Sequence, residues 1–179
     1  MGVLETVVVA IWLMLPAYLP NNVAVLAGGG PPIDGGRRWR GQRVLGDGKT
    51  WRGTGAGIAA GVLLALALNL LNPSVPGGVD LPEFPVLAVL ALPTGAMLGD
   101  MVASFLKRRT GRERGAPFPG VDQLDFVIGA LGLCLLAAPT WFLETFTLGV
   151  LVVIFVVTPV LHVTTNALGY ALGVKDEPW

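Results

Sequence analysis

Residues 100–125 read D-M-V-A-S-F-L-K-R-R-T-G-R-E-R-G-A-P-F-P-G-V-D-Q-L-D and join two strongly apolar segments. Three aspartates, Asp100, Asp122 and Asp125, lie inside or against runs that are long enough to cross a membrane. Carboxylates at such positions are energetically costly and usually mark a functional site. The Lys and Arg residues between them can bind several phosphate groups. The stretch therefore predicts a membrane fold that holds a polar site at its boundary.

The composition indicates an integral membrane protein. Of the 179 residues, 53% are hydrophobic and 13% are charged, and the mean hydropathy of +0.68 exceeds that of ordinary soluble domains. Five apolar runs can each cross a hydrocarbon core of about 30 Å at about 1.5 Å per residue. Their continuous apolar character favours helices over a membrane barrel. We predict an all-α bundle of five transmembrane helices, one membrane domain over residues 1–179, with helices at 3–27, 53–71, 84–106, 123–142 and 146–172.

The cations gather between alternate apolar runs, in the loops 28–52 and 107–122 and after the last run. These cations are Arg37, Arg38, Arg40, Arg43, Lys49, Arg52, Lys107, Arg108, Arg109, Arg112, Arg114 and Lys175. The opposite end of the bundle carries Glu5, Asp80, Glu83 and Glu144 without Lys or Arg. The positive-inside rule then predicts a multi-pass protein of the cell membrane with its N-terminus outside, its C-terminus cytoplasmic and both basic loops cytoplasmic. Contact with anionic lipid head groups is an alternative use of Arg37, Arg38 and Arg40.

Polar residues interrupt two of the apolar runs. Pro16, Pro20, Asn21 and Asn22 predict a kinked first helix that lines a polar pocket. The two asparagines could instead join helices by hydrogen bonds. His162 lies in the last run, where we expect a hydrogen-bonded bundle residue away from the acidic cluster.

A glycine-rich stretch, Gly46-Asp47-Gly48-Lys49-Thr50-Trp51-Arg52-Gly53, precedes the second apolar run. Glycines beside a lysine and a hydroxyl can offer backbone N–H groups, the Lys49 ammonium and the Thr50 hydroxyl to phosphate oxygens. The stretch is not a P-loop, because that motif requires a glycine at the position of Arg43 and a preceding strand. We predict an anion site at the start of a membrane helix, whose dipole also favours negative charge.

The third run closes with residues whose spacing places them on one helical face. Asp100, Ser104, Lys107 and Arg108 are separated by four, three and one residues. Asp100 then requires a cation, either a basic side chain or a divalent metal. Asp122 and Asp125 could serve only as acids at a helix start. Together with Asp100 they could instead hold Mg2+, which prefers carboxylate oxygen ligands and substrate phosphates.

The two basic loops together resemble the signatures of CDP-diacylglycerol synthases, the membrane phosphatidate cytidylyltransferases. Residues 104–125 carry Ser-x-x-Lys-Arg, Pro-Gly and Asp-x-x-Asp, and residues 48–53 carry Gly-Lys-Thr-Trp-x-Gly. Residues 45–53, Pro32-x-Asp34-x-Gly36 and residues 119–125 are most similar to the short archaeal branch, the CDP-archaeol synthases. Val121 and Gln123 flank Asp122 where the bacterial signature has Gly and Arg, which favours an archaeal ether lipid over diacyl phosphatidate.

The resemblance implies transfer of CMP from CTP to an isoprenoid ether-lipid phosphate, with release of pyrophosphate. It implies a catalytic set of Asp100, Asp122, Asp125, Lys107 and Lys49, with the three aspartates on Mg2+. The implied substrate-binding residues are Asn21, Asn22, Asp34, Lys49, Thr50, Arg52, Ser104, Lys107 and Arg108. Membrane lipids are the remaining partners, and nucleic acid is not expected.

Three other functions compete with this interpretation. One is the same reaction on a diacyl substrate. A CDP-alcohol phosphotransferase would carry a tight series of aspartates on adjacent helices, which this sequence lacks. A small ion or lipid transporter commonly shows an internal repeat, and none is visible in the sequence.

Overall fold

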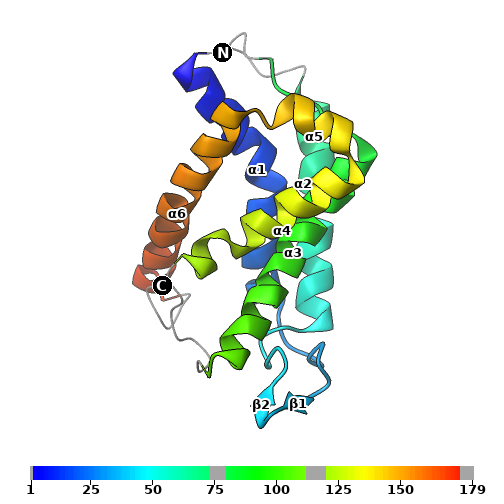
Figure 1. The fold of residues 1–179 in the computed structure, drawn as a ribbon, viewed down its shortest axis with the longest axis vertical. Coiled ribbons are helices and arrows are strands. Elements are labelled where there is room, and N and C mark those ends of the chain that lie inside the picture. Colours follow the sequence, from blue (N-terminus) through cyan, green and yellow to red (C-terminus); the bar gives the residue numbers. More distant parts are fainter. Residues whose placement is uncertain (1, 73–79, 112–119, 174–179) are drawn as a thin grey trace.

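The computed structural model of the chain describes residues 2–72, 80–111 and 120–173 and forms a helical bundle (Figure 1). Four helices are long and apolar enough to cross a membrane. They are α1 (Val3–Leu26), α2 (Trp51–Leu71), α3 (Val86–Arg109) and α6 (Leu148–Ala171). The predicted all-helical, multi-pass membrane fold agrees with this architecture. Arg112, Arg114, residues 117–119 and Lys175 lie outside the described residues.

Two helices occupy the segment where the sequence predicts one helix over 123–142. The helix α4 (Val121–Ala137) has 17 residues, and α5 (Pro139–Thr145) has 7. Ala138 separates them with φ −136° and ψ 60°. Pro139 causes the break, because proline has no N–H to donate and disfavours helical geometry in the residue before it. The predicted fourth transmembrane helix is therefore divided at Ala138, and neither α4 nor α5 is among the four helices that are long and apolar enough to cross a membrane.

The loop between α1 and α2 contains a small hairpin that the sequence analysis did not anticipate. The strands β1 (Arg38–Trp39) and β2 (Gln42–Arg43) pair antiparallel and lie at one end of the bundle. Arg109 at the end of α3 holds the hairpin, since its guanidinium donates to the carbonyl oxygens of Trp39 at 2.6 Å and Arg43 at 2.7 Å. The same guanidinium lies 5.0 Å from the centre of the Trp39 ring. The hairpin is thereby fastened to the cation-rich end of α3.

A buried carboxylate organises the rest of this loop. Asp34 is 8% exposed and accepts hydrogen bonds from Arg43 Nη2 at 2.7 Å and from the backbone N–H groups of Leu45, Gly46 and Gly36. The Arg43 guanidinium, aided by those N–H groups, holds the pKa of the Asp34 carboxyl well below its usual range despite burial. The carboxylate in turn raises the pKa of Arg43. The loop therefore forms around one charged centre.

The helix α2 packs against α1 through a row of glycines four residues apart. A Cβ at Gly57 would lie 2.6 Å from the Pro20 carbonyl oxygen, and one at Gly61 would lie 2.6 Å from that of Pro16. Pro20 has no N–H, so it leaves the Pro16 carbonyl without its usual helical donor. The bare backbone of Gly61 covers that carbonyl, and the two prolines are tolerated at a close helix contact.

The helices α3 and α4 meet in the same way, and this contact borders the acidic residues. A Cβ at Gly99 would overlap the Asp125 carbonyl oxygen, and one at Gly129 would overlap the Gly95 carbonyl oxygen. Small residues allow two helix backbones to approach closely within a membrane. This contact sets the distance between Asp100, which follows Gly99, and Asp125.

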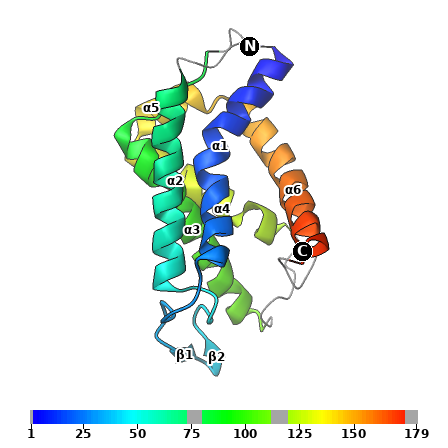
Figure 2. The same cartoon turned by 180° about the vertical axis from the view of Figure 1, so that it is seen from behind.

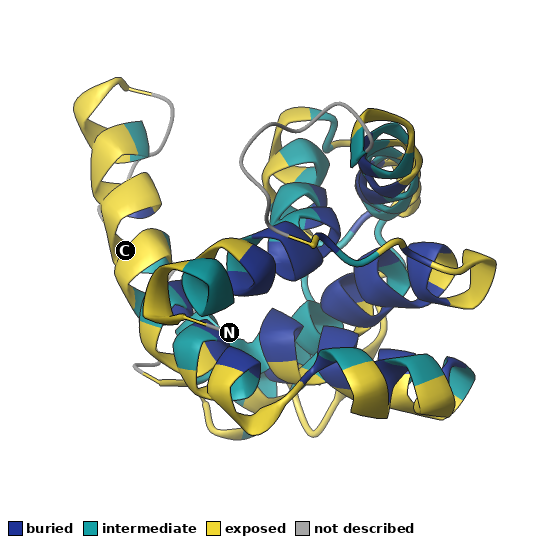
Figure 3. Ribbon diagram, turned by 90° about the horizontal axis from the view of Figure 1, so that it is seen from above, coloured by how far each residue is buried: buried dark blue, intermediate teal, exposed yellow. Residues whose placement is uncertain are grey.

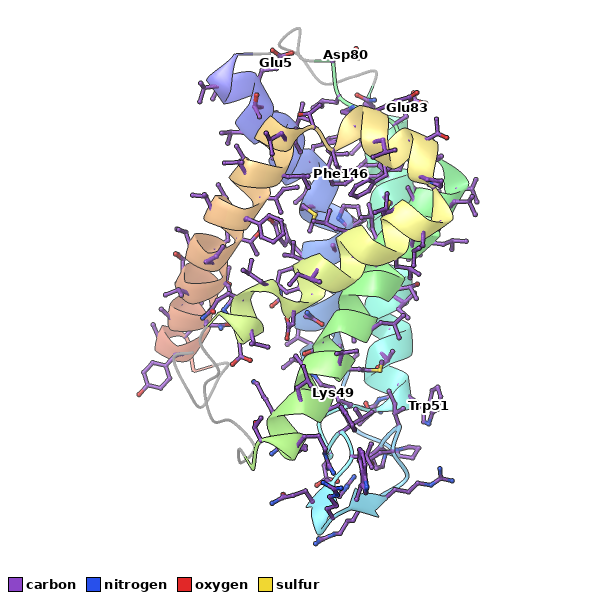
Figure 4. The ribbon with its side chains drawn as sticks, in the orientation of Figure 1. Glu5, Lys49, Trp51, Asp80, Glu83 and Phe146 are labelled. Carbon is purple, nitrogen blue, oxygen red and sulfur yellow. The ribbon has the colours of Figure 1, made fainter. Side chains whose placement is uncertain are left out.

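The helix α6 stands apart from the rest of the bundle (Figures 2 and 3). Among the described elements it packs against α1 and α4, and it is coloured as exposed over most of its surface in Figure 3. Charged ends also separate along the long axis. Figure 4 places Glu5, Asp80 and Glu83 at one end, with Lys49 and Trp51 toward the hairpin end. The separation of acids from cations that the sequence predicts is therefore present in the fold.

Candidate active site

A cavity of about 400 Å3 lies between α1, α3, α4, α6 and the start of α2. Its charged lining is Lys49, Asp100, Lys107, Asp122 and Asp125. Neutral polar groups complete it, contributed by Tyr18, Asn21, Asn22, Thr50, Thr54, Ser104, Thr158, His162, Thr165 and Asn166. The volume falls within the usual range for small-molecule sites. All three predicted aspartates thus line one hollow.

A second cavity of about 310 Å3 adjoins the first between the α1–α2 loop and α3. The two cavities share Gly48, Lys49, Asp100, Ser104 and Lys107. The second one adds the cations Arg43 and Arg108 and the carboxylate of Asp47, which is paired with Arg43. A ligand in each cavity would therefore meet the other at the shared residues.

Two ion pairs cross the site. Lys49 Nζ contacts Asp100 Oδ2, and Lys107 Nζ lies 2.6 Å from Asp122 Oδ1. Each of these four side chains is about one-fifth exposed, between 20% and 23%. The sequence left the cation that neutralises Asp100 open, and in this structure it is Lys49. That pair brings the Gly-Lys-Thr loop against the Asp100 turn of α3.

Helical phase explains why α3 presents its polar groups to the cavity. Asp100, Ser104 and Lys107 follow one another at spacings of four and three residues, and all three line the larger cavity. Arg108, one residue further, turns toward the smaller cavity. The spacing predicted a shared face for these residues, and the structure places them around the shared space.

The three carboxylates line one cavity, but in the described residues no group of three acidic, His or Cys side chains is positioned to hold a metal ion. Two of the acids are engaged by lysines, and Asp125 Oδ1 accepts a hydrogen bond from Phe126 N at 2.6 Å. Mg2+ typically uses one or two carboxylates together with substrate phosphates. The donor set therefore fits such an ion once a lysine exchanges its carboxylate for a phosphate.

The start of α4 does not use Asp122 or Asp125 as a helix cap, which was the simplest structural role for these two acids. Gly120 occupies the N-cap position, with φ 83°, and Asp122 lies in the first turn. Asp125 lies beyond that turn. The cap itself does not use either carboxylate, although Asp122 is favourably placed near the helix N-terminus.

Thr50 and the two asparagines also line the larger cavity. Thr50 caps α2, since its hydroxyl oxygen accepts from Gly53 N at 3.1 Å. Asn22 Nδ2 donates to the Tyr18 carbonyl oxygen of its own helix at 3.2 Å. In the described part of the chain, Asn21 Oδ1 is buried and has no hydrogen-bond partner. A buried oxygen without a donor could accept a hydrogen bond from a ligand in the cavity.

Two predicted substrate residues lie outside both cavities. Asp34 organises the α1–α2 loop as described above and lines neither hollow. Arg52 donates from Nε to the Ala27 carbonyl oxygen at 2.8 Å and also to the Gly28 carbonyl oxygen. In the structure Arg52 joins the start of α2 to the end of α1.

The expectation that His162 lies away from the acids is wrong. His162 lines the same cavity as Asp122 and Asp125, together with Thr158 and Asn166 of α6 and Tyr18 of α1. The prediction failed because α6 is apolar around most of its circumference, so its hydrophobic pattern does not reveal which side faces the bundle. The four-residue spacing of Thr158, His162 and Asn166 was the available signal.

Known proteins similar to the chain share one description. The family described as CarS-like, CDP-archaeol synthase, matches residues 3–179. The CDP-archaeol synthase of Haloarcula marismortui is 67% identical over 181 residues and covers 100% of both chains. That of Methanosarcina acetivorans is 50% identical over 176 residues, 93% of this chain and 100% of the relative. A solved structure of an intramembrane enzyme for archaeal membrane lipids biosynthesis is 38% identical, with a TM-score of 0.69, and covers 88% of this chain and 92% of that one.

Proposed function

The chain belongs to the CDP-archaeol synthase family, and we propose that its reaction takes place where the two cavities share Lys49, Asp100, Ser104 and Lys107. It is a CTP-dependent cytidylyltransferase that makes CDP-archaeol. A lipid phosphate oxygen forms a bond to the α-phosphorus of CTP, and the bond to the β-phosphate breaks to release pyrophosphate. The observation that carries the location is the pair of cavities meeting at two lysines and an aspartate.

The two ion pairs hold the site ready for charged substrates. CTP and a lipid phosphate bring several negative charges, and phosphates attract Lys49 and Lys107 away from their carboxylates. Asp100, Asp122 and Asp125 would be the residues to hold Mg2+ together with substrate phosphates, and the ion would offset phosphate charge and polarise the phosphoryl group. Because Asp100 and Asp122 are each paired with a lysine beforehand, the empty site limits uncompensated charge at the membrane boundary.

The smaller cavity suits the triphosphate of CTP. Lys49, Lys107 and Arg108 line it, and Gly46 and Gly48 leave its wall without side chains. Nucleotidyl transfer requires mainly positioning and stabilisation of developing charge, which cations around an open pocket supply. The larger cavity, which extends between the helices, takes the lipid phosphate. Ser104 faces both cavities and is placed to donate to a phosphate at their junction.

The hairpin end of the bundle faces the cytoplasm in this proposal, with the N-terminus outside and the site in the cell membrane. The cation-rich loops favour that orientation, and CTP is available on that side. Gly111 is exposed beside this end. A cysteine introduced by Gly111→Cys should react with an impermeant reagent only from the cytoplasmic side. Labelling from outside would overturn the orientation.

An assay of purified protein in detergent tests the site. Labelled CTP, Mg2+ and a geranylgeranyl ether-lipid phosphate should yield CDP-lipid and pyrophosphate, and chelation of the metal should stop the reaction. Asp100→Asn and Asp125→Asn should each reduce turnover by about 100-fold or more while the protein stays folded. Asp80→Asn, at the opposite end of the bundle, is the matched control. Near-normal activity of either site variant would remove that carboxylate from the site.

The same assay decides between lipid substrates. A diacyl phosphate offered beside the ether lipid should be a poorer substrate if Val121 and Gln123 mark the archaeal branch. Equal turnover of the two lipids would contradict the assignment of chain chemistry without affecting the cytidylyl transfer itself.

A further inference from the structure

The wall that α6 contributes to the larger cavity is neutral, in contrast to the walls from α3 and α4. Its cavity residues are Thr158, Leu161, His162, Thr165 and Asn166. The helix from Leu148 to Ala171 contains no Asp, Glu, Lys or Arg. A triphosphate requires cations close to it. The α6 wall is therefore unsuited to the nucleotide phosphates and must contact another part of the substrates.

The bundle-facing side of α6 changes from apolar to polar along one stripe of four-residue spacing. Val150 and Ile154 are buried and apolar. Thr158, His162 and Asn166 continue the stripe, with Thr158 1% and Asn166 5% exposed. Buried hydrogen-bonding groups are costly at membrane depth unless they have a partner. Apolar packing would serve a purely structural helix better, so the polar half of the stripe indicates binding.

Hydrogen bonds hold this stripe in place at two levels. The Tyr18 hydroxyl and Thr158 Oγ1, which both line the cavity, are 2.8 Å apart and join α1 to α6. The Tyr18 ring meets Phe126 of α4 edge-on at 5.8 Å. One to two turns further along α6, Asn166 Nδ2 lies 3.3 Å from His162 Nδ1. The polar groups are therefore preorganised rather than spread over a loose surface.

We propose that Thr158, His162 and Asn166 bind the glycerol end of the lipid phosphate, through the two oxygens that carry its chains. This inference rests on the proposed function. Ether oxygens accept hydrogen bonds and donate none, so a hydroxyl, an imidazole and an amide are complementary to them. The outward side of α6 is exposed and apolar at Val156, Val160 and Val163. Leu161 lines the cavity and is also exposed, so the edge of the cavity at α6 reaches the outer surface of that helix, where the lipid chains can enter the bilayer.

If α6 binds the lipid, substitutions in its cavity residues should change KM for the lipid phosphate and leave KM for CTP unchanged. His162→Leu and Asn166→Leu should each raise KM for the lipid phosphate by about fivefold to tenfold, the usual effect of one lost hydrogen bond. KM for CTP and the preference for CTP over UTP should not change. His162→Gln should restore most of the loss, because it keeps a donor. Thr164→Val is the control, since its hydroxyl donates to the Val160 carbonyl oxygen at 2.7 Å and does not line the cavity.

A binding measurement separates this inference from the proposed function. Lipid phosphate added without CTP should raise the Tm of the wild type and of Thr164→Val more than that of His162→Leu. If the leucine variants do not fold, Thr158→Val, which is nearly isosteric, serves in the same comparison. An unchanged lipid KM would overturn the inference, and a raised CTP KM or a lost preference over UTP would assign the wall to the cytosine ring. A wild-type protein that makes no CDP-lipid would instead overturn the proposed function.

Discussion

Gly99→Ala should separate α3 from α4 and slow the reaction, because the new methyl group has no room. A Cβ at residue 99 would overlap the Asp125 carbonyl oxygen and lie 2.9 Å from the Asp125 carbonyl carbon and 3.1 Å from Gly129 Cα. Carbon atoms in ordinary contact are about 3.5–4.0 Å apart, so the helices must part by about 0.5–1 Å. Asp100 and Asp125 border this contact from opposite helices. A displacement of that size at a reacting centre can reduce the rate by about 100-fold.

Gly132→Ala on α4 is the matched control, since no atom lies within 4 Å of its Cβ position. Both variants gain helix propensity of about 0.5–1 kcal/mol, so their difference isolates the steric clash. Overpacking should cost Gly99→Ala about 1–3 kcal/mol of stability. The assays are the initial rate of CDP-lipid formation and the midpoint of unfolding in detergent. If Gly99→Ala is as active and as stable as Gly132→Ala, the close α3–α4 contact does not position the carboxylates.

Other variants test the pairings at the hairpin end of the bundle. Lys49→Met and Asp100→Asn should each lower kcat/KM by about 100-fold. The double variant should lose far less activity than the product of the two single losses, because the two residues form one pair. A loss equal to that product would show that they act separately. Asp34→Asn should expose the α1–α2 loop to protease. The pKa of Asp34 is depressed, so its stabilisation is complete above about pH 4, the ordinary aspartate value, and decreases only as the pH falls toward the lower folded value. Faster cleavage of the wild-type α1–α2 loop as the pH is lowered from 8 to 5 would contradict this pH range for the stabilisation by Asp34. Arg109→Lys should speed cleavage of the hairpin, since lysine cannot reach two carbonyl groups as a planar fork. Arg40→Lys should match the wild type, because within the described ranges the Arg40 side chain lies over the Trp39 ring and no hydrogen bond of its guanidinium is found.

Much of the site could be predicted from the sequence, because its charged residues lie next to long apolar segments. Asp100, Ser104 and Lys107 share a face because helix geometry requires it, and the membrane makes any acid among apolar residues conspicuous. Lys49 and Asp100 can meet only if the two basic loops lie at the same end of the bundle. The alternating directions of the helices place both loops at that end. These inferences needed periodicity and charge alone.

Features set by tertiary packing were harder to predict. The orientation of α6 depends on its line of contact with α1 and α4, so His162 was expected away from the acidic cluster, whereas it lines the same cavity as Asp122 and Asp125. Asp34 and Arg52 were assigned to substrate from family resemblance, whereas the structure places them in contacts that hold the loop and the helix ends. The break at Pro139 left a local signal, a proline within an apolar run, that the length of the run concealed.

The shortness of α4 has a consequence for the surrounding bilayer. Its 17 residues extend about 25 Å along the helix, less than the hydrocarbon thickness of about 30 Å, and Figure 1 shows it running obliquely, which shortens its reach further. A short span is accommodated by local thinning of the membrane. If α4 crosses the bilayer, head groups beside it would be drawn inward, toward the level of Asp122 and Asp125. Hydrophobic mismatch at α4 would then shorten the path by which a lipid phosphate leaves the membrane surface and reaches the carboxylates.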